Sequence, residues 1–288
     1  MLRQGLLVVV ATAVGVAAGS QWMRSSATTG GTTGGTTRGT TLDTAASAYQ
    51  APRTADGKPD LNGFWQALGT AHWDIESHAA QAGPVLALGA AFAVAGGPGI
   101  VKDGEIPYQP WALAKKQENF EKRLTLDPEI KCYMPGVPRA TYMPHPFQIL
   151  QGTSKVVLAY EFADTSRTIH LDAVGESPAE TWMGWSKGRW EGDSLVVDVT
   201  SFNDQTWFDR AGNFHSEALH VVERYTRTGP DHLAYEATIE DPKVFTRPWT
   251  VSLPLYRRQE SDLQLVEYKC VEFVEELMYG HLTKGARR

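Results

Sequence analysis

The second half of the chain consists of short segments in which apolar and polar residues alternate one by one. The clearest of them is His232–Glu240, in which every second residue is apolar. A period of two is typical of a β-strand that buries one face. We therefore predict a run of roughly eight or nine strands. The segments that show the pattern are Lys155–Phe162, Arg167–Asp172, Ser194–Thr200, Glu217–Tyr225, His232–Glu240, Trp249–Tyr256 and Leu263–Phe273.

The links between these segments carry turn residues and no helical pattern. Examples are Glu191-Gly192-Asp193, Arg227–Asp231 and Glu240–Lys243. Strands joined by short links pair antiparallel, because a parallel pair needs a long crossover. The expected fold is therefore mostly β, an antiparallel up-and-down β-barrel (lipocalin-like) with a few peripheral helices. A two-sheet β-sandwich is the alternative.

Two segments of the first half stand apart from this pattern. Tyr108–Arg123 is expected to form a helix with a proline near its start, and its candidate packing residues are Trp111, Leu113 and Phe120. Ala82–Val101 is apolar but is interrupted by prolines and many glycines. We expect it to be a buried irregular segment or flap rather than a membrane span, and it could equally line the mouth of a ligand site.

The N-terminus has the features of a secretory signal peptide. Arg3 precedes an apolar run that ends in small residues near Ala18. We predict a signal peptide over residues 1–18, a flexible Thr/Gly-rich linker over 19–50 and a single β-rich domain over 51–288. The protein would then be periplasmic or secreted. The alternative is an uncleaved N-terminal segment that anchors the protein in a membrane.

The chain has two cysteines, Cys132 and Cys270. Because an exported protein meets an oxidising compartment, we expect a disulfide bond between them. Such a bond would tie the start of the domain to its last strand. Two buried free thiols are the alternative.

The charge of the chain limits its partners. There are 27 Lys and Arg against 33 Asp and Glu, a net charge of −6, and no basic block stands out. Nucleic acid is therefore not an expected partner. We expect a small-molecule ligand or substrate, and contact with a membrane only through an uncleaved N-terminal segment. The sequence identifies no cofactor.

Residues 184–188 (GWSKG) fit the G-x-S-x-G pattern of a nucleophile elbow, with Ser186 at its centre. In such an elbow the serine lies between a strand and a helix of a parallel sheet. Here the strand Ser194–Thr200 follows almost directly, and no alternation of strands and helices surrounds the motif. We therefore interpret Ser186 as a residue of a β-hairpin and not as a nucleophile.

Three stretches carry a resemblance to a protein family. GKPDLNGFWQ (57–66), GRWEGDSLVVDVTSFNDQTWFDRAGNFHSEALHVVERY (188–225) and TIEDPKVFTRPW (238–249) resemble a family of secreted, uncharacterised bacterial proteins. The resemblance covers nearly the whole domain. It implies secretion and a single domain, and it brings no activity with it.

The densest polar cluster is Asn203–Ser216, which links two predicted strands. It contains Asp204, Trp207, Asp209 and His215, and loops on a rigid barrel often carry binding groups. The alternative is a structural loop in which the acids and amides form turns and the aromatic side chains are buried anchors.

Other candidate residues lie on the predicted strands. His170 and Asp172 are two residues apart, so they share a face and could act together as ligands or as a base with its carboxylate partner. His220 and Glu223 lie on a later strand, and Trp185 is a candidate stacking group. A hydrogen-bonded polar network is expected here rather than a metal site, so no metal ligand is assigned.

Three classes of function fit these observations. The first is a β-barrel that binds a small, partly apolar or aromatic ligand in a polar-lined pocket at its mouth. The second is an acid–base enzyme, a lyase, isomerase or hydrolase, that uses the same pocket. The third is a structural envelope protein. The ligand-binding candidates are His170, Asp172, Asp204, Trp185 and Trp207, and the catalytic candidates are His215, His220, Asp209 and Glu223.

Overall fold

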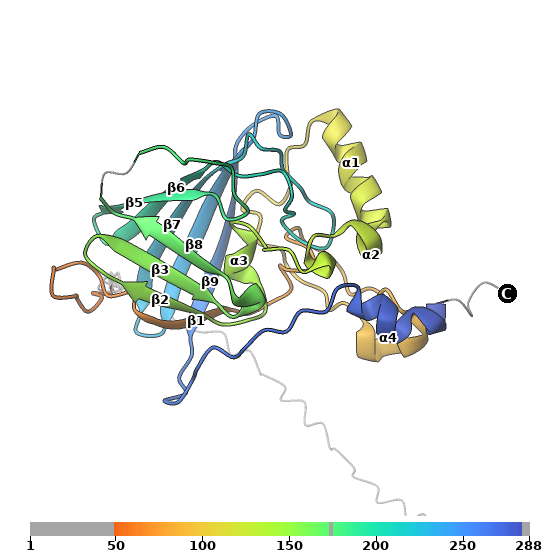
Figure 1. The fold of residues 1–288 in the computed structure, drawn as a ribbon, viewed down its shortest axis with the longest axis horizontal. Helices are drawn as coiled ribbons and strands as arrows, with labels where there is room; N and C mark the ends of the chain where they lie inside the picture. The colour runs from red at the N-terminus through yellow and green to blue at the C-terminus, as the bar shows by residue number, and fades with distance from the viewer. Residues whose placement is uncertain (1–48, 173–174, 284–288) are drawn as a thin grey trace, which may run out of the picture. The chain divides into compact units, whose positions relative to one another are not determined.

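The strands of the protein close into a single barrel. The structure is a computed structural model that describes residues 49–172 and 175–283, and within these residues nine strands form the barrel (Figure 1). The strands are β1 (Gly63–Ala67), β2 (Phe147–Gln151), β3 (Lys155–Tyr160), β4 (Ser166–His170), β5 (Trp185–Glu191), β6 (Ser194–Thr200), β7 (His220–Gly229), β8 (His232–Glu240) and β9 (Trp249–Arg257).

Each strand pairs with its neighbour in sequence, and β1 pairs with β9 to close the barrel. The predicted barrel with peripheral helices is confirmed, and closure excludes the sandwich. One part of the prediction is wrong, because β4 and β5 pair in parallel, with Ile169 opposite Ser186. The connection between them, residues 171–184, is long enough to return the chain to the starting end of β4, as a parallel pair requires.

Alternation along the strands produces the core of the barrel. On β8 the side chains of Leu233, Tyr235, Ala237 and Ile239 point inward and are fully buried. The residues between them are half-buried on the outer face. Burial of one face of every strand stabilises the barrel, since each buried Leu or Ile side chain contributes about 1.5–3 kcal/mol.

The strand expected at Leu263–Phe273 is absent from the structure. Residues 263–271 have no regular secondary structure, although the sequence there alternates between apolar and polar residues. The edge of β9 that this segment would need is already paired with β1, which sequence analysis did not identify as a strand. Alternating apolar and polar residues indicate an extended backbone, but residues 263–271 do not pair with another strand.

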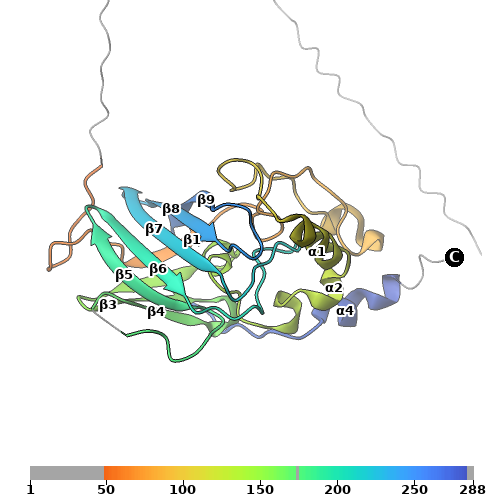
Figure 2. The same ribbon diagram turned by 90° about the horizontal axis from the view of Figure 1, so that it is seen from above.

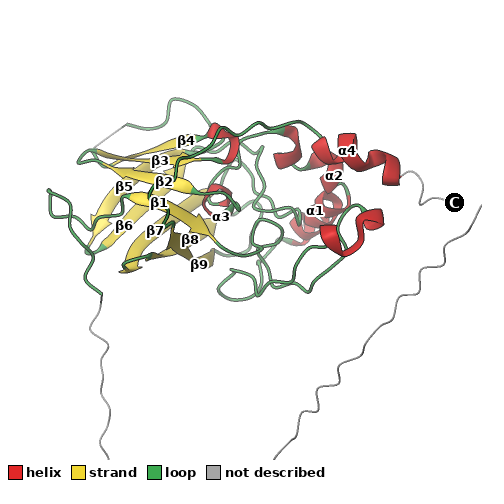
Figure 3. Ribbon diagram, turned by 90° about the horizontal axis from the view of Figure 1, so that it is seen from below, coloured by secondary structure: helices red, strands yellow, loops and turns green. Residues whose placement is uncertain are grey.

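The helices gather at one end of the barrel (Figures 2 and 3). This helical end also contains the loop between β6 and β7. Its elements are α1 (Pro110–Glu121), α2 (Arg123–Leu126), α3 (Arg139–Tyr142), α4 (Val274–Thr283) and the 3-10 turns η1 (Leu86–Phe92), η2 (Glu129–Lys131) and η3 (Phe162–Asp164).

Two details of the expected first half need correction. The predicted helix exists as α1, but Trp111 and Leu113 are exposed and the buried residues are Ala112 and Asn119. The Nδ2 atom of Asn119 donates to the carbonyl oxygen of Gly212 at 3.3 Å, which fixes α1 to the β6–β7 loop. Ala82–Val101 is irregular as expected, but half of its residues are exposed and only Gly83, Val85 and Val94 are buried.

The predicted disulfide bond between Cys132 and Cys270 is confirmed. It does not tie down a last strand. Instead it fixes residues 258–283, here called the C-terminal arm, to the segment that follows η2. The predicted signal peptide and nearly all of the predicted linker lie outside the described residues. Within the described residues no helix has the length and apolar character needed to cross a membrane.

Candidate functional site

The structure brings two of the predicted ligand-binding residues together. The rings of His170 on β4 and Trp185 on β5 stack with centroids 4.8 Å apart. Both side chains lie on the outer face of the barrel, because their neighbours Ile169 and Ser186 point inward. Asp172 follows β4 in a bend and is exposed. These residues therefore form part of a surface and not of a barrel mouth.

Glu223 lies inside the barrel in a charged network. It is fully buried and forms an ion pair with Arg167, and the hydroxyl groups of Tyr225 and Tyr235 donate to its Oε1 at 3.0 and 2.8 Å. Burial opposes the charge of Arg167, but Glu223 outweighs this effect and holds the pKa of the guanidinium well above its ordinary value. The network is a paired structural core.

Ser186 belongs to this same interior network. It lies in β5 with a buried side chain, and its Oγ accepts a hydrogen bond of 2.8 Å from Nε of Arg167. In a serine hydrolase a general base would hydrogen-bond to this hydroxyl, but here the partner of Ser186 is an arginine. The glycines of the motif serve packing, since a Cβ on Gly188 would lie 2.5 Å from Cγ2 of Ile169. Ser186 is a hairpin residue, as the sequence indicated.

Asp209 organises the β6–β7 loop. It is completely buried and accepts hydrogen bonds from the backbone N–H groups of Ile75, Ala211 and Asn213 and from Nδ2 of Asn213. Burial raises the pKa of Asp209 to about 7, and the charge of Asp74 adds to this effect while the Asn213 contact opposes it. Its contacts join the loop to the segment after β1.

His215 lies in the same loop and is also buried. Its Nδ1 lies 2.9 Å from the carbonyl oxygen of Ser216, so Nδ1 donates and Nε2 accepts from the hydroxyl of Thr206 at 2.6 Å. Burial disfavours the charged ring and lowers the pKa of His215. Both ring nitrogens are occupied by structural contacts.

The remaining predicted residues lie elsewhere. His220 is on the outer face of β7, with Nε2 3.1 Å from Oδ2 of Asp198. Asp204 is exposed, and Trp207 is buried, as in the structural interpretation of the loop. The four catalytic candidates His215, His220, Asp209 and Glu223 therefore occupy four separate environments, and none of the hydrogen bonds described above joins one to another.

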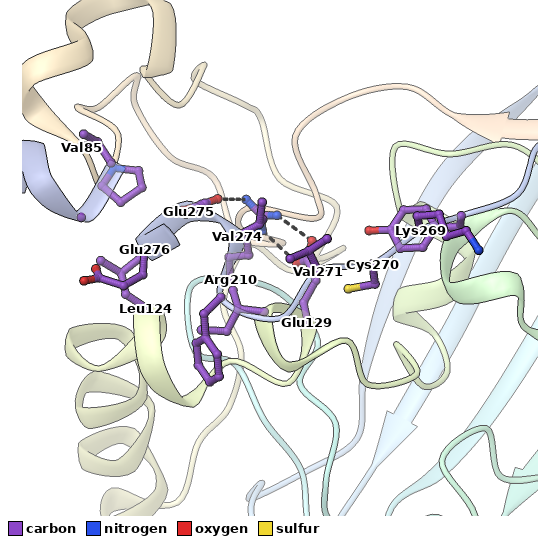
Figure 4. A pocket seen from close by; sticks show the side chains of 15 residues that line it. Val85, Leu124, Glu129, Arg210, Lys269, Cys270, Val271, Val274, Glu275 and Glu276 are labelled. Carbon is purple, nitrogen blue, oxygen red and sulfur yellow. Dashed lines mark hydrogen bonds and ion pairs between the residues drawn. The ribbon is translucent and has the colours of Figure 1, made fainter. Parts of the chain in front are cut away.

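A cavity lies at the helical end, beneath the C-terminal arm (Figure 4). We call it the arm cleft, and its volume is about 170 Å³. Its walls come from the start of η1, from α2 and η2, and from the arm with α4. The apolar lining residues are Pro84, Val85, Leu124, Ile130, Val271, Phe273 and Val274, and the charged ones are Glu129, Arg210, Lys269, Glu275 and Glu276.

An ion pair forms the polar part of the arm cleft. Arg210 donates from Nε and Nη2 to the two carboxylate oxygens of Glu129, at 2.8 and 2.6 Å. Its third nitrogen, Nη1, lies 3.6 Å from Glu275, and its guanidinium lies 4.3 Å from the ring centre of Trp73. Figure 4 shows Arg210 between Glu129 and Glu275. The side chain of Arg210 is thus held on three sides.

Further charges lie directly behind this pair. Arg139 of α3 is buried and bonds both Glu129, at 2.5 Å, and Asp127, at 3.2 Å. Burial opposes the charge of Glu129, but Arg210 and Arg139 outweigh it and lower the pKa of Glu129 to about 2. Glu129 is therefore ionised at any physiological pH.

His72 belongs to the same cluster. Its carbonyl oxygen accepts from the backbone N–H of Arg210 at 3.1 Å. Burial, with the nearby charge of Arg210, lowers the pKa of the His72 ring to about 4, although Glu129 acts in the opposite direction. Its Nδ1 is buried and has no hydrogen-bond partner among the described residues. A neutral imidazole therefore lies beside the ion pair at neutral pH.

The arm is held in place by the disulfide bond, by ring contacts and hydrogen bonds, and by the ion pair between Arg210 and Glu275. The ring of Tyr268 packs against Phe162, at a centroid distance of 4.8 Å, and against His145, at 5.4 Å. Its backbone N–H donates to Asp164 at 3.2 Å. Cys270, two residues further on, lines the arm cleft. The disulfide bond thus fixes the outer wall of the cavity.

No cluster of three or more His, Cys, Asp and Glu residues suited to a metal ion occurs in the described part of the chain. No family model, curated protein or solved structure matches this chain.

Sequence analysis missed the residues that build the arm cleft. Arg210 lies inside the polar cluster that it singled out, but its partner Glu129 was not considered. The predicted disulfide bond was the one feature of the sequence that could have located this cavity. A bond between Cys132 and Cys270 places residues 268–275 beside residues 129–134, and both ranges carry charged groups.

Proposed function

We propose that the protein is a secreted or periplasmic binding protein that holds a small, partly apolar molecule in the arm cleft. The observation that carries the proposal is the combination of an apolar wall with a fixed ion pair, Arg210–Glu129, among the charged residues of the lining. Specific ligand sites have this composition, with mostly apolar walls and a few polar groups that set orientation. The disulfide bond supports export, because such bonds persist in oxidising compartments.

The size of the cavity limits the ligand. An apolar cavity of about 150 Å³ is large enough for benzene. The arm cleft, at about 170 Å³, therefore suits one aromatic ring or a branched aliphatic group of similar size. A larger molecule would leave part of its structure outside the cavity.

The ion pair indicates the polar group of the ligand. Arg210 makes short hydrogen bonds through Nε and Nη2, but its Nη1 is 3.6 Å from Glu275, beyond normal hydrogen-bond distance. This N–H group is available to a hydrogen-bond acceptor on the ligand. A hydroxyl, carbonyl or carboxylate oxygen attached to an apolar ring fits this arrangement.

The arm cleft is a better site than the barrel mouth considered first. The inward side chains of the barrel are closely packed and buried, including the Arg167–Glu223 pair. The alternative function as an acid–base enzyme has less support, because the polar atoms of His215 and Asp209 all form structural hydrogen bonds. The geometry therefore favours binding over catalysis by the four residues proposed for it.

Binding of benzyl alcohol, benzoate and toluene to the purified protein tests the proposal, measured by changes in amide NMR signals. We expect changes centred on Ile130, Arg210 and Val274. Val271→Trp, which fills the cleft, should abolish them. Val266→Trp is the matched control, because Val266 is an exposed valine of the same arm that does not line the cavity.

The proposal fails if none of the three probes shifts signals of the cleft residues, or if Val266→Trp weakens binding as much as Val271→Trp. Mass spectrometry of small molecules that co-purify from the host would identify the natural ligand. A cleft-dependent ligand should be present with the native protein and depleted with Val271→Trp.

A further inference from the structure

The helix α4 presents its apolar residues to solvent. Val274, Leu277 and Met278 are spaced three and four residues apart, so they share one face of the helix, and all three are exposed. Glu275 and Glu276 line the arm cleft, as does Val274 at the start of the helix. An ordinary surface helix buries its apolar face and exposes its charges. In α4 the apolar residues Leu277 and Met278 are exposed, whereas Glu275 is half-buried.

The segment next to α4 is also apolar and exposed. From Ala82 to Val101 there are 20 residues without a single polar side chain. The segment contains η1, where Leu86 is 70% exposed, and Leu277 of α4 is exposed to the same extent. Large exposed apolar surfaces are rare on monomeric proteins and mark sites that contact another protein, a membrane or a ligand.

The two elements lie side by side (Figure 1). The rings of Phe92 in η1 and Tyr279 in α4 meet edge to face, with centroids 5.0 Å apart. We define the apolar face as Leu86 of η1 together with Val274, Leu277 and Met278 of α4. Because η1 and α4 are in contact, these residues belong to one region of the helical end.

We propose that the apolar face binds the surface of an anionic lipid bilayer, with α4 lying in the plane of the membrane. Lys284, Arg287 and Arg288 follow α4 directly in the sequence. Basic residues beside an apolar helix are attracted to anionic headgroups, while the apolar side chains enter the boundary with the acyl chains. These three residues lie outside the described part of the chain, and in the sequence they provide basic charge shortly after the helix.

The composition of the apolar face favours lipid over a protein partner. Protein interfaces are enriched in aromatic residues, methionine and arginine, and tryptophan, tyrosine and arginine provide most of their binding energy. The apolar face consists of Leu, Val and Met, with alanines and glycines along the adjoining η1 segment. A bilayer needs only apolar area and basic charge. The apolar face offers the first, and the sequence after α4 contains the second.

Flotation of the purified full-length protein with vesicles tests the proposal. Vesicles of phosphatidylcholine with phosphatidylglycerol should bind the protein, and vesicles of phosphatidylcholine alone should bind it less. Leu277→Asp should lower the bound fraction roughly ten-fold or more, because it removes a leucine from the lipid boundary. Arg287→Gln with Arg288→Gln should reduce the preference for anionic vesicles.

Leu113→Asp is the matched control. Leu113 is an exposed leucine on α1, outside the apolar face, so its replacement should leave flotation unchanged. The N-terminal segment is common to all variants, and differences between them therefore report on α4. The proposal is overturned if the native protein does not float, or if Leu113→Asp lowers flotation as much as Leu277→Asp. It is also overturned if Leu277→Asp dissociates a dimer without changing flotation.

Discussion

Glu129 accepts two hydrogen bonds from one edge of the Arg210 guanidinium, from Nε at 2.8 Å and from Nη2 at 2.6 Å. The same carboxylate binds Nη2 of Arg139 at 2.5 Å. One acidic group on η2 therefore connects the β6–β7 loop with α3 at the end of the barrel. The ion pair has two consequences, since it forms the polar part of the arm cleft and stabilises the helical end.

Replacement of Glu129 by glutamine should destabilise the protein. It leaves two partly or fully buried arginines with less opposite charge, and loss of one partner of a buried ion pair costs about 3–5 kcal/mol. We expect a decrease toward the lower end of this range in urea unfolding at pH 7, because Arg210 retains some solvent contact. Glu191→Gln, which breaks exposed pairs with Arg189 and Arg224, should leave the unfolding midpoint unchanged.

The pH dependence of this difference follows from the pKa of Glu129. The pKa is about 2 in the folded protein and 4.5 ordinarily, so the stabilisation is complete above pH 4.5. It is lost as the pH falls from 4.5 toward 2, and the native protein and Glu129→Gln should then converge. A constant difference in the free energy of unfolding across this window would contradict the assigned role.

The period-two pattern predicted most of the barrel but could not predict pairing. Six of the predicted segments coincide with strands, whereas Leu263–Phe273 has the same pattern and lies unpaired in the arm. Periodicity reports which residues share a face, and the partner of a strand depends on the rest of the fold. The short strand Gly63–Ala67, which closes the barrel, has too few residues to show a period.

The candidate site depended still more on tertiary structure. His72, Glu129, Arg139 and Arg210 are far apart in the sequence, and no local pattern connects them. Asp209 and His215 were singled out by the density of polar residues around them. Density correctly located a buried polar cluster, but it did not distinguish groups that bind a ligand from groups that hold a loop together.

Removal of the disulfide bond with Cys132→Ser and Cys270→Ser should release the C-terminal arm. Besides this bond, the arm is held by the rings of Tyr268 and Tyr279, by the ion pair of Glu275 with Arg210 and by a few hydrogen bonds. In the chain-entropy model a closed loop of this length contributes on the order of 5 kcal/mol. We expect trypsin to cleave the variant at Arg258 and Lys269 while the barrel stays intact, as measured by mass spectrometry.

The control for this experiment is the oxidised native protein under identical digestion. Loss of the β-sheet signal in circular dichroism of the variant before digestion would show that the bond supports the barrel itself. Resistance of the variant to trypsin at both sites would show that other contacts are enough to hold the arm.

Acidification should destabilise the protein through His72. Burial and Arg210 lower the pKa of His72 from 6.5 to about 4 in the folded protein, whereas the unfolded chain takes up the proton near pH 6.5. The unfolded state therefore binds more protons between these values, and stability is lost as the pH falls from 6.5 to 4. The full effect is about 3 kcal/mol.

The variant His72→Leu should show a smaller loss of stability between pH 7 and pH 4.5 than the native protein. His215, whose pKa is also lowered by burial, contributes in the same direction and remains in the variant. His232→Leu, at an exposed position at the start of β8, should keep the native pH dependence. Equal slopes for the native protein and His72→Leu would refute this assignment.

The variant Asp209→Asn should loosen the β6–β7 loop. Asp209 accepts four hydrogen bonds and donates none, and an asparagine amide replaces one accepting oxygen by a donor. At least one buried N–H group then loses its acceptor, at a cost of about 1–3 kcal/mol. Hydrogen exchange of the amides of Ile75 and Ala211 should accelerate. Asp204→Asn, on the exposed part of the loop, should leave both rates unchanged.

The buried pair of Arg167 and Glu223 inside the barrel provides a double-mutant cycle. Glu223→Gln keeps an acceptor for Tyr225 and Tyr235 but leaves Arg167 without a negatively charged partner. Arg167→Met in turn leaves the buried Glu223 without a positively charged partner. Each single change should cost about 3–5 kcal/mol.

The double variant Arg167→Met with Glu223→Gln contains no uncompensated charge. Its loss of stability should therefore be smaller than the sum of the two single losses by more than about 1 kcal/mol, the range in which interacting residues depart from additivity. Urea unfolding of the four proteins at pH 7 measures this coupling. If the losses simply add, Arg167 and Glu223 stabilise the barrel independently, and the charged core is not held together by their pairing.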